Sequence, residues 1–238
     1  MRAFALLALP LLVACVEPTT TPRPGGSTTA PAATSSNAAH LTPSQANREF
    51  VRVVQTIEPV AEAECRRRAP RSNCDFLIVI DDRPNQPPNA FQTLDDTGRP
   101  VIAFNLGLIA MAYNADELAF VLGHEAAHHI NGHIARTQAN AATGALIFAG
   151  LAALTGAGEN EVRAAQDIGA TVGARSYSKD FELEADALGT RITARAGYDP
   201  VRGAAFFTRI PDPGNRFLGT HPPNAARIET VRREAAKL

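Results

Sequence analysis

The chain has 238 residues, 45% of them hydrophobic and 20% charged, which suits one globular domain with a substantial core. The formal net charge is −1, so the composition gives no indication of a nucleic-acid partner. Tryptophan is absent and aromatic residues make up 6% of the chain, which argues against a surface on which bases would stack.

Residues 1–14 have the pattern of a signal peptide. Arg2 supplies the positive charge, and residues 3–14 are an apolar stretch too short to span a bilayer, which needs about 20 residues. The sequence LVAC resembles a bacterial lipobox, and this resemblance implies cleavage before Cys15 and attachment of lipid to it. Val16 follows instead of aspartate, which favours the outer membrane in the sorting of Gram-negative lipoproteins. The alternative is a soluble secreted protein in which Cys15 is incidental.

Residues 15–41 are rich in proline, threonine, serine, alanine and glycine. Such a composition cannot bury enough apolar surface to fold, so we expect a disordered tether that begins at the lipidated cysteine. His40 lies in this tether and is expected to be solvated. The folded domain is expected to cover residues 42–238.

The first elements of the domain are expected to be a helix and three strands. Thr42 is the expected N-cap of the helix, with Pro43 at its first position and Gln45 at the capping-box position. Runs of β-branched and aromatic residues then predict strands at 76–80, 89–94 and 99–104.

Cys65 and Cys74 are expected to form a disulfide, because export places the domain in an oxidising compartment. On the chain-entropy estimate, closing this short loop would stabilise the fold by roughly 2.5–3 kcal/mol. The alternative is a pair of buried free thiols.

The second half of the chain is expected to be helical, beginning with a long helix at 115–138 that Asn114 caps. Residues 142–158 are apolar but interrupted by glycines, so we expect a buried helix or hairpin, and the alternative is a membrane-facing or lid segment. Together the elements predict an α+β fold that is mainly helical with a small β-sheet. The remaining helices are expected at residues 161–173, 181–196, 200–210 and 223–237.

The sequence HEAAH has the H-E-x-x-H pattern of a zinc site. His124 and His128 are four residues apart on the predicted helix, so both imidazoles can reach one ion. Glu125 flanks them and can reach a water molecule beside the ion. His129 and His133 lie on other sides of a continuous helix, so we expect them to be surface or hydrogen-bonded core histidines.

A third ligand is expected from the segment KDFELEADALG. Glu182 and Asp186 are four residues apart and share a helix face, whereas Glu184 points away from that face. One carboxylate can bind the ion and the other can accept the remaining N–H of a ligating histidine. The segment alone is compatible with a solvated acidic face, but its apolar neighbours and the H-E-x-x-H motif favour a metal site.

H-E-x-x-H followed by E-x-E-A-D-x-x-G resembles the HtpX and BepA type of zinc metallopeptidase, which includes the prenyl-protein protease relatives. Residues 88–91, 114–129 and 219–227 resemble the same family, and the resemblance covers about 74–231. It implies a zincin-like metalloprotease domain in which the sheet lies beside the H-E-x-x-H helix. The membrane-spanning members have several hydrophobic helices that this chain lacks, so the periplasmic lipoprotein members are the closest in layout.

The resemblance also implies roles for individual residues. It assigns one Zn²⁺ per chain to His124, His128 and Glu182. Glu125 matches the general base, and Asp186 matches the acid that supports a ligand. Three protein ligands leave one position open for water, which is typical of a catalytic zinc site.

Further matches lie around this site. His221 matches a residue that in some relatives caps the metal or steadies the oxyanion, and Arg227 matches a partner of that region. Asn89, Ala90 and Phe91 match an edge strand that could hold an extended substrate by main-chain hydrogen bonds.

The expected function is therefore a zinc-dependent endopeptidase, anchored by lipid in the bacterial outer membrane and facing the periplasm. Its expected substrates are unfolded or misassembled envelope polypeptides, because main-chain binding does not select side chains. One alternative is a zinc-stabilised chaperone or assembly factor for envelope proteins. A zinc-binding lipoprotein for metal supply is less favoured, because the tether has only one histidine.

Overall fold

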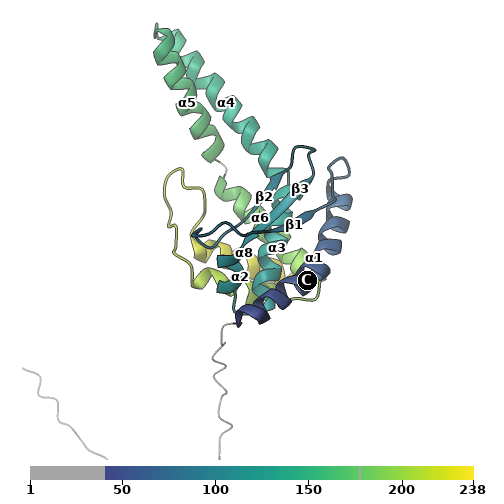
Figure 1. Cartoon of the computed structure of the whole chain (residues 1–238). Helices are drawn as coiled ribbons and strands as arrows, with labels where there is room; N and C mark the ends of the chain where they lie inside the picture. The colour runs from purple at the N-terminus through teal and green to yellow at the C-terminus, as the bar shows by residue number, and fades with distance from the viewer. Residues whose placement is uncertain (1–40, 177) are drawn as a thin grey trace, which may run out of the picture. The chain divides into compact units, whose positions relative to one another are not determined.

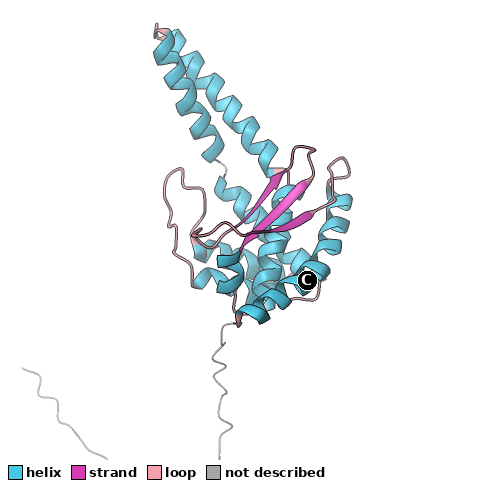
Figure 2. Cartoon of the chain, in the orientation of Figure 1, coloured by secondary structure: helices cyan, strands magenta, loops and turns pink. Residues whose placement is uncertain are grey.

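The structure is a computed structural model that describes residues 41–176 and 178–238 (Figure 1). The predicted signal peptide, the lipidation site Cys15 and the predicted tether up to His40 lie outside the described residues. Helices dominate the domain, and one small sheet lies against them (Figure 2). This arrangement confirms the predicted α+β, mainly helical fold.

Helix α1, Pro43–Arg68, opens the domain as its sequence predicts. The Thr42 side chain accepts a hydrogen bond from the backbone N–H of Gln45, and the Gln45 side chain accepts one from the Thr42 N–H, which completes the capping box. At the other end of the helix, Cys65 and Cys74 are joined by a disulfide with a Cα–Cα distance of 5.7 Å. This bridge ties the end of α1 to the approach to the first strand.

The sheet has three strands in the order β1-β3-β2, formed by Leu77–Asp81, Pro100–Asn105 and Ala90–Leu94 respectively. β1 runs parallel to β3, and β2 runs antiparallel to β3. The three predicted strands are confirmed to within one residue at each end. Within the described part of the chain β2 pairs with β3 alone, so its other edge can accept an additional strand.

Asn105 fixes the loop that leads into β2. Its side-chain oxygen accepts hydrogen bonds from the backbone N–H groups of Asn89 at 3.0 Å and Leu108 at 2.9 Å, and its amide donates to the Pro87 carbonyl at 2.6 Å. The contact with Leu108 also caps α2, Leu106–Met111, a short helix that the sequence pattern did not reveal.

The predicted continuous helix at 115–138 is wrong in its continuity, because it is broken at residues 131–132. α3 covers Ala115–Ile130, and the chain then turns at Gly132, whose φ is +65°, before α4 begins at His133. Glycine adopts this left-handed conformation without the steric penalty of a Cβ atom, so the turn is compatible with its sequence. The break changes the direction in which His133 projects.

α4, His133–Leu154, and α5, Glu159–Ser176, form a helical hairpin that extends away from the sheet (Figure 1). The expectation that 142–158 would be buried is wrong, because Leu146 is 75% and Leu154 is 87% exposed. Packing against one neighbouring helix covers only one side of α4. Among the described helices, α4 alone has the length and apolar composition needed to cross a membrane.

α6, Ser178–Arg195, packs closely on α3 through two glycines. A Cβ atom on Gly189 would lie 2.9 Å from the backbone nitrogen of His124, and one on Gly123 would lie 3.0 Å from the Gly189 carbonyl. The absence of these side chains therefore sets the distance between the two helices. The chain ends with α7 at Pro200–Gly203, a 3-10 helix at Ala204–Thr208 and α8 at Asn224–Ala235.

We expect Gly189→Ala to separate α3 from α6, because the added methyl group meets backbone atoms that cannot move independently. Overpacking of this kind costs about 1–3 kcal/mol, so the unfolding temperature should fall. Thermal denaturation measures this temperature, with Gly150→Ala as a control because that glycine has open space around it. Wild-type behaviour of Gly189→Ala would show that the close contact is not required.

Candidate metal centre and cleft

Two histidines of α3 and one glutamate of α6 converge at one point. The Nε2 atoms of His124 and His128 are 3.0 Å apart, and the Glu182 carboxylate lies 3.6 Å from the first and 3.4 Å from the second. One potential ligand atom from each residue lies within 4.8 Å of the other two. Two imidazole nitrogens and a carboxylate oxygen at these separations fit a single divalent ion.

Asp186 and Arg227 both contact His124. The Nδ1 atom of His124 lies 2.9 Å from an Asp186 oxygen, so its N–H donates to the carboxylate and leaves Nε2 free to face the ligand cluster. Arg227 donates to both oxygens of Asp186, at 2.8 and 2.7 Å. Its guanidinium also lies 4.0 Å from the centre of the Phe207 ring. Asp186 thus lies behind one candidate ligand, whereas Arg227 contacts His124, Asp186 and Glu182 and lines the cleft.

The surroundings of Glu182 and Asp186 favour the charged form of both carboxylates. Burial alone would raise the pKa of Glu182, but its contacts with His128, His124 and Arg227 outweigh burial and lower that pKa. Burial would likewise raise the pKa of Asp186, and Arg227 with His124 reverses this effect. An ionised Glu182 is the state that a metal ligand requires.

His128 has a hydrogen-bonding partner, His133, that the sequence pattern did not predict. Its Nδ1 atom lies 2.8 Å from Nδ1 of His133, and Nε2 of His133 lies 3.1 Å from a carboxylate oxygen of Glu184. Glu184 does leave α6 on the side away from Glu182, as expected, but it reaches this buried histidine. His129 instead lies 2.7 Å from the Asn73 carbonyl oxygen, as a hydrogen-bonded histidine outside the cluster.

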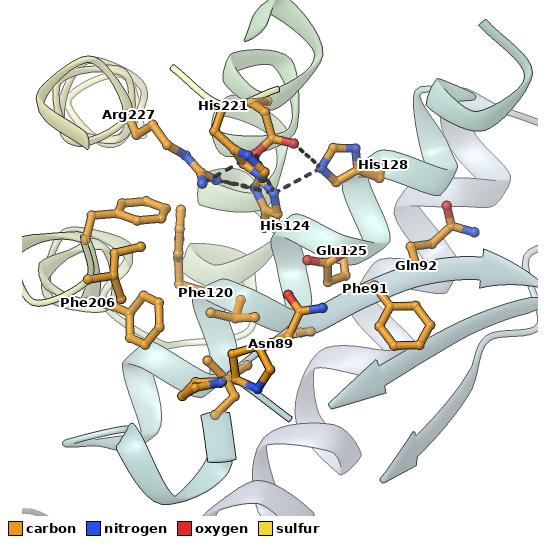
Figure 3. A pocket seen from close by; sticks show the side chains of 18 of the residues that line it. Asn89, Phe91, Gln92, Phe120, His124, Glu125, His128, Phe206, His221 and Arg227 are labelled. Atoms are coloured by element: carbon orange, nitrogen blue, oxygen red, sulfur yellow. Dashed lines mark hydrogen bonds and ion pairs between the residues drawn. The ribbon is translucent and has the colours of Figure 1, made fainter. Parts of the chain in front are cut away.

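A cleft of about 930 Å³ opens over the ligand cluster, and Glu125 lines it. Figure 3 shows Glu125 between the two candidate ligands His124 and His128 and the strand that carries Phe91 and Gln92. The predicted edge-strand residues also line this cleft. The site therefore combines a carboxylate, a candidate metal cluster and a strand edge that no other described strand covers in one space.

His221 borders the cleft from the loop before α8. Its side chain is 55% exposed, and its Nε2 atom lies 4.0 Å from a Glu182 oxygen. Its Nδ1 atom is 2.9 Å from the Thr220 hydroxyl. Figure 3 shows His221 and Arg227 on the same side of the ligand cluster. His221 is thus close to Glu182 but outside the three-residue ligand set.

The apolar wall of the cleft was not anticipated. Phe120 lies one turn before His124 on α3, where an apolar residue at helical spacing looks like any core position. The others come from α2 and the segment around the 3-10 helix, so only the folded chain brings them together. Large apolar side chains of this wall include Met111, Phe120, Phe206, Phe207 and Ile210.

The fold and the cluster define a class: a zincin-like metallopeptidase domain with an H-E-x-x-H helix and a carboxylate ligand from a later helix. Residues 47–235 match peptidase family M48, and the chain belongs to that family. M48 peptidases depend on a metal ion, and His124, His128 and Glu182 form the candidate site for it here. The predicted HtpX and BepA type of metallopeptidase is thereby confirmed.

Several curated relatives share this domain. A beta-barrel assembly-enhancing protease of Escherichia coli is 28% identical over an alignment of 159 residues that covers 58% of this chain and 31% of the relative. The mitochondrial metalloendopeptidase OMA1 of Saccharomyces cerevisiae is 31% identical over an alignment of 166 residues that covers 65% of this chain and 45% of the relative. A protease HtpX homolog of Thermococcus kodakarensis is 30% identical over an alignment of 197 residues that covers 65% of this chain and 67% of the relative. The chain thus spans less than half the length of the first two.

We expect Asp186→Asn to weaken metal binding, because the amide cannot replace the charge that orients His124 and pairs with buried Arg227. Loss of such a partner typically lowers metal affinity about 10–100-fold. Competition with a chelator measures this affinity. Asp180→Asn is the matched control, since Asp180 is exposed on the same helix. Equal affinities for the two variants would show that Asp186 does not support the ligand.

Proposed function

We propose that this chain is a zinc-dependent endopeptidase of the bacterial cell envelope. The observation that carries the proposal is the position of Glu125, which follows candidate ligand His124 directly and faces the same cleft as the edge strand. A site that uses zinc only for structure needs neither a carboxylate beside the ligands nor a substrate-sized cleft. The family membership supports the same reaction class.

The proposed ion is one Zn²⁺ per chain, held by His124, His128 and Glu182. Two imidazoles and one carboxylate form a donor set of catalytic zinc sites, which keep one coordination position open. When bound, the ion supplies Lewis acidity, which polarises a peptide carbonyl and makes water a nucleophile near neutral pH.

The chain's own residues perform the proton transfers and hold the substrate. Glu125 accepts a proton from the attacking water and returns it to the amine that leaves. The free edge of β2 pairs with an extended peptide, and Asn89, Ala90 and Phe91 lie where that peptide enters the cleft. In this proposal His221 steadies the oxyanion, supported by its position 4.0 Å from Glu182, and Arg227 holds Asp186 and Glu182.

The proposed substrates are misfolded or misassembled envelope proteins. Strand addition recognises the main chain, which only unfolded or extended segments expose. The name of the Escherichia coli relative, a beta-barrel assembly-enhancing protease, supports a function in envelope assembly. We further propose a lipid anchor on Cys15 and a tether that lets the domain face the periplasm from the outer membrane.

Glu125→Gln should abolish most proteolysis without loss of zinc, because the amide cannot accept the proton of water. General-base removal typically costs about 10²–10⁴-fold in rate. Cleavage of an unfolded casein substrate and zinc content per chain are the two measurements. Glu161→Gln is the control, since Glu161 is exposed on α5. Undiminished cleavage by Glu125→Gln would contradict its role, and equal rescue of envelope stress by both variants would favour a chaperone function.

Cys15→Ser should release the protein from membranes, because serine offers no thiol for lipid attachment. Fractionation of bacteria that express the full chain measures its location, and mass spectrometry detects acyl chains. The original protein should carry lipid and sediment with the outer membrane. A membrane-bound Cys15→Ser protein, or an original protein without lipid, would contradict the proposed anchor.

A further inference from the structure

His133 is a buried polar side chain whose two ring nitrogens both have partners. It is 4% exposed, with Nδ1 at 2.8 Å from Nδ1 of His128 and Nε2 at 3.1 Å from Glu184. Its ring stacks on Phe181, with the centroids 4.6 Å apart and the planes at 9°. These contacts fix both the position and the orientation of the ring.

The turn at Gly132 is what allows this contact. On a continuous helix, residues five positions apart project about 140° from each other, so His133 would point away from His128. The left-handed φ of +65° at Gly132 ends α3 and starts α4 in a new direction. His133, the first residue of α4, thereby returns to the outer side of the His128 ring.

The hydrogen bonds define which nitrogen carries each proton. Nε2 of His128 faces His124 and Glu182, so as a metal ligand it must keep its lone pair, and the ring proton is on Nδ1. That N–H donates to Nδ1 of His133, which must then be the acceptor. His133 consequently carries its proton on Nε2 and donates it to Glu184, whose carboxylate Arg136 also holds at 2.5 Å.

We propose that His133 is a positioning residue of the metal centre, which orients the ring of His128 and links it to the carboxylate of Glu184. His124 has a carboxylate directly behind it in Asp186, whereas His128 reaches one through an intervening imidazole. Each candidate histidine ligand is thus linked to its own carboxylate, and Asp186 and Glu184 project from opposite sides of α6. This inference rests on the proposed zinc site but concerns binding of the ion rather than cleavage of a substrate.

His133→Phe tests the proposal, because phenylalanine keeps a ring to stack on Phe181 but removes both nitrogens. Zinc affinity of the full-length protein, measured by chelator competition, should fall about 10–100-fold. The visible absorption spectrum of the cobalt(II)-substituted protein should change, because the His128 ligand is no longer held in one orientation. His133→Asn should recover part of the affinity, since its amide oxygen can accept the hydrogen bond from His128.

His129→Asn is the matched control, because His129 lies beside His128 on α3 but binds the Asn73 carbonyl instead. It should keep the original affinity and spectrum. If His133→Phe does not fold, Glu184→Gln replaces it and should lower both zinc affinity and kcat while KM stays unchanged. Original affinity and cobalt spectrum in the folded His133→Phe protein, or in Glu184→Gln where that variant is used, would overturn the proposal.

The peptidase function and the positioning role of His133 can be contradicted independently. A protein that binds zinc with the expected dependence on His133 but cleaves no polypeptide would contradict the peptidase function and leave the positioning role supported. An original protein that binds neither zinc nor cobalt at His124, His128 and Glu182 would overturn both.

Discussion

The close contact between α3 and α6 is the constraint on which the site depends. Gly123 and Gly189 bring the two backbones together, so a carboxylate from α6 reaches the histidine pair of α3. The candidate ligand pair His124 and His128 is local in sequence and could form on an isolated helix. The candidate third ligand, Glu182, is not local, because its position requires the whole domain to fold with the correct spacing between helices.

Buried charge is tolerated here because every charged group has a partner. Asp186 and Arg227 form a bidentate pair behind His124, and Glu182 faces both histidines and Arg227. A lone buried carboxylate would take up a proton, whereas these contacts hold the pKa values of both acids below their ordinary range. The network thus prepares an anionic ligand and oriented imidazoles in the folded protein itself.

The sequence predicted features whose determinants are local. The capping box of α1, the three strands and the helical spacing of His124 with His128 depend on nearby residues, and the structure has all of them. It did not predict the break at Gly132, because an isolated glycine is also tolerated within helices. The contact of His133 with His128 follows from that break. The sequence also did not predict that the α4–α5 hairpin is exposed, since apolar composition usually indicates burial.

The central claim is that two imidazoles of α3 and one carboxylate of α6 bind the same ion. Anomalous X-ray diffraction at the zinc absorption edge, from crystals of the zinc-loaded protein, tests it most directly. The account predicts one anomalous peak per chain, about 2.0–2.2 Å from Nε2 of His124, Nε2 of His128 and an oxygen of Glu182. A peak at another position, or one bound by the histidines with Glu182 turned into solvent, would contradict the account.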